Sequence, residues 1–343
     1  MTDAAMESAK LKLKLKRESE RKTKMQNSPT PPPPPSAAKA TNTTANAANG
    51  NHRFKIVFKK PDTEVGHRVL IYGKPGCGKT TMMLKGLPRP LVAFDFDNSI
   101  NILLAKPKEE SGIDPTDIYL ADVPHDAENR IDYGAFLSIL RDAENFEGVK
   151  SVLIDTGTFA ENAIEPYMFE HPDKFPTGNT DKTTGKVKKA ISLADYSFRS
   201  GNIYKLDLYK VMLSFLENLA LAKHIHVGLI YHTAVGKVPN LESPDGFALQ
   251  YQPDSWVQGK TSLAETAMGW CDHVGYIKAD SVMDTIKQGQ GQKAIEKKVE
   301  RYTGDCVISF VSTGDHIGKS RTLYGDAATV PLEDFNLGML GIK

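Results

Sequence analysis

The stretch from residue 73 to residue 80 reads GKPGCGKT and matches the phosphate-binding pattern G-x-x-x-x-G-K-[ST]. Its glycines let backbone N–H groups curl around phosphate oxygens, a path that bulkier residues would block. The lysine reaches the β- and γ-phosphates, and the hydroxyl that follows it ligates Mg²⁺. An apolar run, VLIYG, precedes the glycines, and a plausible helix start follows them. The sequence therefore predicts a site for ATP and Mg²⁺ whose nucleotide-contacting residues are Gly73, Lys74, Pro75, Gly76, Cys77, Gly78, Lys79, Thr80 and Thr81.

A P-loop needs a second acidic residue to hold Mg²⁺ or its water, and Asp155 is the candidate. It ends the apolar run SVLID, where a buried carboxylate would be costly unless it served a cation. We therefore predict that Thr80 and Asp155 are the metal ligands. The alternative interpretation is that Asp155 caps the helix that follows it.

Hydrolysis also requires a group that orients the attacking water. The run LVAFDFD ends with Asp95 and Asp97, and strand alternation sends both side chains to one face at the carboxyl end, where α/β proteins bind ligands. Asp97 is our candidate base, with a helix cap for residues 98–105 as the alternative. His232 ends the run HVGLIYH and is either a γ-phosphate sensor or a structural residue. The predicted catalytic residues are thus Lys79, Asp97, Asp155 and His232.

Alternating strand and helix patterns would position these residues. Strands are expected at 54–58, 67–73, 91–96, 117–123, 151–155, 226–232, 273–278 and 306–311, and helices at 99–105, 133–146 and 204–222. Several strands are apolar on both faces, which is typical of a parallel sheet covered by helices on both sides. We predict an α/β doubly wound domain over residues 53–343, with a mostly parallel sheet flanked by helices.

The charge is unevenly distributed along the 343 residues, which carry 43 Lys plus Arg and 42 Asp plus Glu. The first 50 residues contain nine Lys or Arg and four Asp or Glu, a net +5 that leaves −4 on the remainder. They include five consecutive prolines but no aromatic residue, Val or Ile, so residues 1–52 are expected to be a disordered basic tail. The basic run at 10–24 is either an arm for nucleic acid or a solvated tail that aids solubility.

Other features exclude whole classes of protein. The three cysteines form no C-x-x-C pair, which excludes a disulfide scaffold and a structural zinc site. There is no run of 18 apolar residues and no apolar segment of a secretory signal at the N-terminus. We expect a soluble, cytoplasmic protein that does not contact a membrane.

The order GKPGCGKT, LVAFDFD, VLIDT, VGLIYHT and GWCDHVGYI resembles the RecA-like core of phage-type AAA-family ATP-binding proteins, which include the Sak-group single-strand annealing proteins. The resemblance covers about residues 66–325. It implies that Lys79 and Thr80 are the Walker A pair and Asp155 the Walker B aspartate, with ATP at the carboxyl ends of the strands. Asp97 stands where RecA-like proteins usually carry a catalytic Glu, which is a departure from the family pattern.

The same resemblance bears on two further segments. Lys319 and Arg321 match the K-x-R pair that RecA-like rings and filaments insert into a neighbour's ATP site, although a solvated loop fits equally well. DNA contacts are implied in two long Gly- and Pro-rich segments, at 172–202 and at 233–262. Residues 182–205 mix cations with aromatics, the composition that a single-strand groove needs, unless they are a flexible insertion with surface lysines. The candidates are Lys186, Lys188, Lys189, Tyr196, Phe198 and Arg199; the second segment, with Phe247, Tyr251 and Trp256, is less basic.

These inferences predict an ATPase that acts on single-stranded DNA in phage-type recombination or annealing. The partners implied are single-stranded DNA, further copies of the chain in a ring or filament, and a single-strand binding protein. Three alternatives stay open: a helicase-like or remodelling motor, a nucleotide-gated binding module with negligible turnover, and a small-molecule kinase.

Overall fold

The computed structural model describes residues 65–342, except 181–184, 186–187, 240–245, 259–260 and 289–294. The tail expected at 1–52 and the strand expected at 54–58 lie outside the described residues. Among the helices of the described part, none is both long and apolar enough to cross a membrane.

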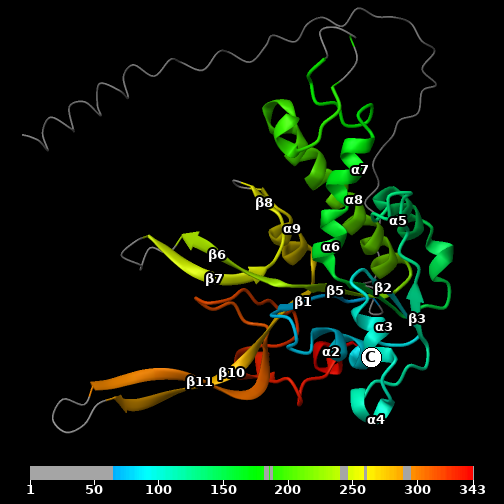
Figure 1. Ribbon diagram of the computed structural model, residues 1–343. Helices are drawn as coiled ribbons and strands as arrows, with labels where there is room; N and C mark the ends of the chain where they lie inside the picture. The colour runs from blue at the N-terminus through cyan, green and yellow to red at the C-terminus, as the bar shows by residue number, and fades with distance from the viewer. Residues whose placement is uncertain are drawn as a thin grey trace, which may run out of the picture. The chain divides into compact units, whose positions relative to one another are not determined.

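Strands and helices alternate through the first two thirds of the described chain (Figure 1). The strands are β1 (Arg68–Gly73), β2 (Leu91–Asp95), β3 (Ile118–Ala121), β4 (Ser151–Asp155), β5 (His226–Tyr231), β6 (Thr233–Pro239), β7 (Phe247–Pro253), β8 (Val257–Gln258), β9 (Thr261–Ser262), β10 (His273–Gln288), β11 (Ile295–Ser309) and β12 (Thr329–Pro331). The α-helices are α2 (Lys79–Gly86), α3 (Ser99–Leu104), α4 (Lys108–Ser111), α5 (Tyr133–Arg141), α6 (Gly157–Asn162), α7 (Ile164–Glu170), α8 (Ser200–Ala222) and α9 (Leu263–Trp270).

Eight of these strands form one sheet in the order β12-β11-β10-β1-β5-β4-β2-β3. All neighbouring pairs from β10 to β3 are parallel, and only β11 and β12 run antiparallel to their neighbours. The prediction of a mostly parallel sheet flanked by helices is therefore confirmed. The β10–β11 pair also continues past the sheet as a long two-stranded arm (Figure 1).

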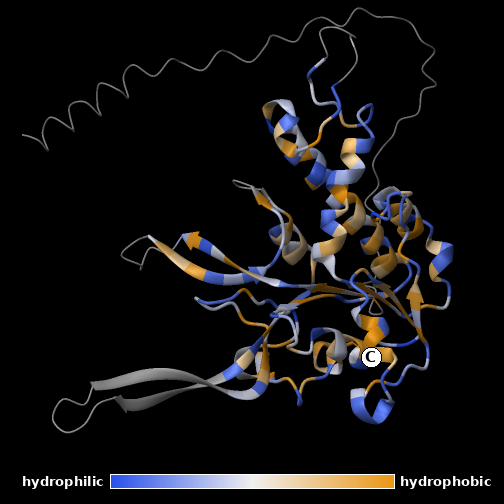
Figure 2. Cartoon of the chain, in the orientation of Figure 1, coloured by the Kyte–Doolittle hydropathy of each residue, from blue (hydrophilic) through white to orange (hydrophobic). Residues whose placement is uncertain are grey.

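Both faces of the sheet are buried, and the alternation along each strand explains how. In β1, Leu70 and Tyr72 face one hydrophobic cluster, which contains the buried side of α8, while Val69 and Ile71 face a second cluster built with α2. Apolar residues accordingly gather along the central strands (Figure 2). Strands that are apolar on both faces need helices on both faces, which is what the sequence pattern predicted.

Some elements differ from the expectation. The segment at 233–262 is not a loop, because β6 and β7 form an antiparallel hairpin in which Val235 pairs with Tyr251, and β8 and β9 follow it. The helices α4, α6, α7 and α9 were not predicted, and α8 begins at Ser200, four positions before the predicted start. Part of the segment at 172–202 therefore belongs to a helix, while most of its remaining described residues are irregular.

Candidate nucleotide-binding site

The predicted nucleotide residues meet at one edge of the sheet because the strand register aligns their strands. Tyr72 pairs with Tyr231, Ile230 pairs with Asp155, and Asp155 pairs with Asp95. The strands are parallel, so the residues that follow each pair emerge at the same carboxyl edge, where α/β sheets bind ligands. The register therefore places the P-loop, the end of β4, the end of β5 and the end of β2 around one site.

The P-loop connects β1 to α2 through a backbone that only glycine adopts readily. Gly76 and Gly78 have φ values of 77° and 87°, in the left-handed region that costs other residues steric strain. Gly78 directly precedes α2, and no side chain caps this helix start. The first N–H groups of a helix have no partner within the helix, so this end of α2 is suited to bind a phosphate.

The ammonium group of Lys79 is held inside the loop. Its Nζ donates hydrogen bonds of 2.9 Å each to the carbonyl oxygens of Gly73 and Lys74, and the residue is buried. Burial lowers the pKa of Lys79, while the carboxylates of Asp155 and Asp97 act in the opposite direction. The loop thus contains a desolvated cation close to two acidic groups.

The predicted metal ligands touch each other. The Thr80 hydroxyl donates a hydrogen bond of 2.7 Å to Oδ2 of Asp155, and the Ser99 hydroxyl donates a longer one of 3.3 Å to the same oxygen. Asp155 is only 1% exposed, and burial together with the neighbouring charges of Asp97 and Asp95 raises its pKa to about 6. Carboxylate and hydroxyl oxygens are the donors that Mg²⁺ prefers, so this donor set fits the ion.

The helix-cap alternative for Asp155 is wrong. The residue that caps α6 is Thr156, whose side chain accepts a hydrogen bond of 3.4 Å from the backbone N–H of Phe159. The carboxylate of Asp155 instead faces α2, where Thr80 lies. A buried carboxylate directed at the P-loop helix is what a metal-binding role requires.

Two acidic residues at the end of β2 have different partners. Asp95 is half-buried, and its Oδ2 accepts a 3.0 Å hydrogen bond from the N–H of Asn101, which holds the first turn of α3. Asp97 is exposed, and its Oδ1 accepts a 3.0 Å hydrogen bond from the N–H of Ser99. Burial lowers the pKa of Lys79 and of His232, and the negative charge of Asp97 raises both pKa values in part. Asp97 therefore acts on groups of the site and also supports the start of α3. Its two proposed roles, catalytic base and helix cap, both stay open.

His232 follows β5 and lies near the P-loop cation. Burial and the positive charge of Lys79 lower its pKa, while Asp97 and Asp254 oppose the shift. Its Nδ1 is buried without a hydrogen-bond partner among the described residues. The ring contacts Phe159 edge-on at 6.4 Å between centroids. A largely neutral imidazole with an unused nitrogen beside the P-loop could hydrogen-bond to a phosphate, so the sensor interpretation stays a prediction.

A cavity of about 460 Å³ opens along α2, beside the P-loop, and the sequence did not reveal it. One wall comes from Gly78, Thr81 and Lys85, and the other comes from residues near the C-terminus, including Leu332 and Phe335. A volume of this order accommodates a small organic ligand, and the far wall combines apolar side chains with the polar Asp305, Glu333 and Asn336. The cavity can receive the nucleoside part of a nucleotide whose phosphates occupy the P-loop. Sequence spacing cannot pair α2 with residues more than two hundred positions away.

The structure separates the predicted DNA-contacting residues into two groups. Phe198 is fully exposed, and Lys188, Lys189 and Arg199 are exposed around the same loop; Lys186 lies outside the described residues. Tyr196 differs, because only 4% of it is exposed and its ring packs beside Gly201, Tyr204 and Phe169. Its ring has no free face, so the assignment of Tyr196 as a base-stacking residue is corrected.

Phe198 owes its exposure to an unusual backbone. Phe198 and Arg199 both have positive φ values, 52° and 62°, directly before α8. Each non-glycine residue in this region costs roughly 1–2 kcal/mol, so two in succession require support from the surroundings. Ser197 supplies part of it, since its N–H bonds to the carbonyl of Thr177 at 2.9 Å and its carbonyl accepts the Ser200 hydroxyl at 2.9 Å.

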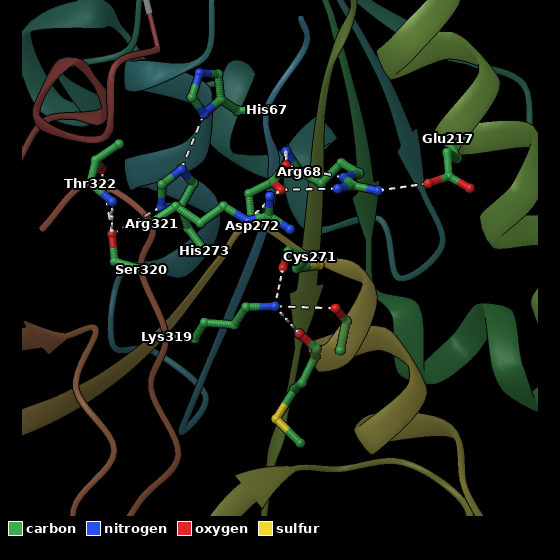
Figure 3. Close-up of polar contacts among 12 residues, drawn as sticks. His67, Arg68, Glu217, Cys271, Asp272, His273, Lys319, Ser320, Arg321 and Thr322 are labelled. Carbon is green, nitrogen blue, oxygen red and sulfur yellow. Dashed lines mark hydrogen bonds and ion pairs between the residues drawn. The ribbon is translucent and has the colours of Figure 1, made fainter. Parts of the chain in front are cut away.

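The predicted trans pair, Lys319 and Arg321, lies beside the start of β10, where Lys319 pairs with Val274. Figure 3 shows both side chains with their neighbours. The Lys319 ammonium donates hydrogen bonds to the carbonyls of Met268, Gly269 and Cys271 at 3.2, 3.1 and 2.6 Å. An ammonium has three donors, and here all three serve the end of α9. A trans role of Lys319 would require it to leave these carbonyls, and it stays a prediction.

Arg321 has a weaker attachment to its own chain. Its Nε lies 3.1 Å from Oδ1 of Asp272, a carboxylate that is already held by Arg68, and its side chain is 62% exposed (Figure 3). An exposed guanidinium with unused donors could still act on another molecule, so the trans role of Arg321 stays a prediction.

One protein family matches the part of the chain that contains this site. Residues 66–194, which contain the P-loop, Asp97 and Asp155, match the family described as an AAA domain. No curated protein matches the chain. Among solved structures, that of the RadB recombinase is similar at 13% sequence identity and a TM-score of 0.35, over 74% of this chain and 92% of that one. The parallel sheet, the P-loop geometry and the match to an AAA domain together indicate a P-loop fold that is suited to bind a nucleotide.

Proposed function

We propose that this protein hydrolyses ATP and couples the reaction to single-stranded DNA during recombination or annealing. The observation that carries the ATPase part is the contact between Thr80 and the buried Asp155, next to the cation of Lys79. A cation, a hydroxyl and a carboxylate at the start of a helix bind the phosphates and the Mg²⁺ of a nucleotide.

Each residue of the site has a task in this reaction. Lys79 would leave the loop carbonyls for the β- and γ-phosphates, while the N–H groups at the start of α2 bind the remaining phosphate oxygens. Bound by Thr80 and Asp155, Mg²⁺ would neutralise the charge on the phosphates. Asp97 would orient the attacking water and accept its proton, and His232 would contact the γ-phosphate.

The surface around Phe198 supports the DNA part of the proposal. A fully exposed aromatic ring can stack on a base, and the exposed Lys188, Lys189 and Arg199 can bind phosphates. Stacking on a ring tolerates any base, so such a surface suits binding without a sequence preference. The β6–β7 hairpin would add a second contact surface, since Phe247 and Leu249 are more than half exposed.

A ring or filament of this chain is part of the proposal. Arg321 would reach the ATP site of the next subunit, as its exposure allows. The domain limits, 1–52 for the tail and 53–343 for the ATPase, are proposed on the sequence pattern.

One experiment tests the proposed function as a whole. ATP turnover is measured with Mg²⁺, without DNA and with an excess of oligo(dT), and the same DNA is used in a strand-annealing assay and an unwinding assay. We expect turnover that rises with DNA, together with annealing. Turnover with unwinding favours a helicase-like motor, and phosphate transfer to an acceptor other than water would replace the proposal with a kinase.

A binding module with negligible turnover is the second candidate. It is favoured by the hydrogen bond that Asp97 makes to the start of α3, which leaves this carboxylate less free to act as a base. Tight binding of Mg²⁺ and ATP with no release of phosphate, with or without oligo(dT), would establish it.

A further inference from the structure

Glu161 is a buried acidic residue that takes no part in the nucleotide site. It lies in α6, six positions after Asp155, and it is 1% exposed. A buried carboxylate is costly unless its oxygens receive hydrogen bonds, and here three donors supply them. Oε1 accepts from the Tyr231 hydroxyl at 2.9 Å, and Oε2 accepts from the Trp256 N–H at 3.2 Å. The one proton of the Ser255 hydroxyl is shared between Oε1 and Oε2, which lie 2.8 and 2.7 Å from its oxygen.

These donors come from the two ends of the β6–β7 hairpin. Tyr231 is the last residue of β5, immediately before the hairpin, and Ser255 and Trp256 follow it. The hairpin base is closed by the Asp254 N–H, which donates to the carbonyl of His232 at 2.8 Å. Glu161 therefore joins the strand that enters the hairpin to the chain that leaves it.

The contact between α6 and β5 is unusually close. A Cβ atom at Gly157 would lie 2.3 Å from Cζ and 2.7 Å from the hydroxyl oxygen of Tyr231, so only glycine lets the helix lie on this ring. A second α6 residue also holds the hairpin base, because the Thr158 hydroxyl donates to the carbonyl of Asp254 at 2.9 Å. The helix that directly follows the Asp155 strand is thus fitted against the base of the hairpin.

The same junction reaches the helix that carries Phe198. Trp256 lies under the ammonium of Lys205, 5.2 Å from the ring centroid, and Lys205 pairs with Glu165 at 2.6 Å. Lys205 is buried in α8, a little more than one turn after the helix begins. The two proposed DNA surfaces are the β6–β7 hairpin and the Phe198 loop, which is the segment from Lys188 to Arg199 before α8. Both therefore connect to the residues around Glu161.

We propose that Glu161 is a positioning residue that couples the β6–β7 hairpin and the Phe198 loop to the nucleotide site. Movement of the hairpin base is transmitted through the carboxylate to α6 and to the end of β5, and hence to Asp155 and His232. This inference rests on the proposed function. It adds to that function the residue through which DNA and nucleotide affect each other's binding.

The test measures coupling rather than activity. The Kd of a non-hydrolysable ATP analogue with Mg²⁺ is determined without DNA and with saturating oligo(dT), and the ratio of the two values is the coupling factor. Linkage requires the same factor when the Kd of the DNA is measured with and without the analogue. Coupling between two sites typically gives a factor of about 5–150, and we expect the wild type to lie in this range.

Three variants separate coupling from structure. Glu161→Gln places an amide NH₂ among three donors, and we expect its coupling factor to fall to about 1 while each ligand still binds alone. Ser255→Ala removes the hydroxyl that bridges both carboxylate oxygens and should lower the factor even if Glu161→Gln fails to fold. Glu217→Gln is the matched control and should retain the wild-type factor. This carboxylate pairs with Arg68 (Figure 3) at the amino end of β1, whereas the P-loop follows the carboxyl end.

The outcomes distinguish this inference from the proposed function. A role confined to stability would weaken both ligands or lower the Tm of Glu161→Gln and Ser255→Ala while the coupling factor stays at the wild-type value, which overturns the inference. A wild type whose analogue affinity is the same with and without DNA overturns it as well and leaves the ATP site intact. A wild type that binds no analogue overturns the nucleotide site itself, and the coupling with it.

Discussion

The hydroxyl of Thr80 donates a hydrogen bond of 2.7 Å to the carboxylate of Asp155, although the two residues are 75 positions apart. Thr80 lies in α2, the helix that follows β1 and the P-loop. Asp155 ends β4, which is two strands away from β1 in the sheet. If this pair holds Mg²⁺, its members act as one unit. Thr80→Ala and Asp155→Asn should each weaken binding of Mg²⁺ and ATP, and the double variant should lose less than the two single losses combined.

The expected interaction energy in this double-mutant cycle is about 0.5–3 kcal/mol. Calorimetry with Mg²⁺ and with EDTA measures it, because the variants should resemble the wild type once the metal is removed. Additive losses, or equal losses in EDTA, would mean that the contact only supports the fold.

Asp97→Asn is expected to retain ATP binding and to lower turnover. The amide keeps the shape of the carboxylate but cannot accept the proton of the attacking water, which costs roughly 10²–10⁴ in rate. Phosphate release and analogue binding are measured side by side, with Asp207→Asn, an exposed aspartate of α8, as the control. If binding collapses instead, Asp97 is structural through its bond to Ser99, and Asp95 becomes the candidate base.

Phe198→Ala should weaken binding of single-stranded DNA by about 1–3 kcal/mol at every salt concentration, because salt does not screen stacking. Replacing Lys188 and Lys189 by Ala should instead flatten the slope of log affinity against log salt by roughly 1.4, if both contact phosphates. Fluorescence anisotropy with oligo(dT) over a salt series measures both effects. Tyr196→Phe is the control and should bind normally, since that ring is buried.

Deletion of residues 1–50 tests whether the basic tail, rather than the surface around Phe198, binds the DNA. If the deletion removes the salt dependence while the loop variants retain it, the basic tail is the DNA-binding element.

The pKa of Glu161 predicts how stability changes with pH. Burial raises this pKa from 4.5 to about 7, although hydrogen bonds from Ser255, Tyr231 and Trp256 and the charge of Lys205 oppose the shift. The folded state therefore binds the proton more tightly than the unfolded state, so the wild type loses stability as the pH rises from 4.5 to 7. Relative to Glu161→Gln, this loss should be of the order of 3 kcal/mol.

Denaturant unfolding at pH 5, 6, 7 and 8 measures this difference on both proteins. Three of the titratable groups around Glu161, namely Tyr231, Tyr209 and Tyr133, have pKa values raised well above 10 by burial and do not titrate in this range. Parallel pH profiles of the two proteins would show that Glu161 does not titrate there.

Local patterns predicted the P-loop, Asp155 and the parallel strands of the main sheet, because each depends on residues that are adjacent in sequence. Phe198 and Tyr196 show the limit of this approach, since both are aromatics in a basic segment and only the packing beside Gly201 decides which one is buried. The β6–β7 hairpin escaped detection because its strands are mostly half-exposed and mix polar with apolar residues.

Glu161 and the cavity beside α2 could not be predicted either. The partners of Glu161 come from positions 231 and 255, and the far wall of the cavity comes from residues near position 332. Nothing in the spacing of a single sequence brings such segments together, whereas the P-loop carries its own partners within eight residues.

The most direct test of this account is Mg²⁺-dependent ATP turnover by the wild type and by Lys79→Ala. Lys79 is the side-chain cation held inside the P-loop, and removal of one such stabilising group from a reaction site costs roughly 10²–10³ in rate. Lys106→Ala, an exposed lysine outside the loop, is the control for charge. We predict phosphate release by the wild type and the control, and loss of it in Lys79→Ala at an unchanged Tm. Equal turnover by Lys79→Ala and the wild type would contradict the assignment of this loop as the ATP site.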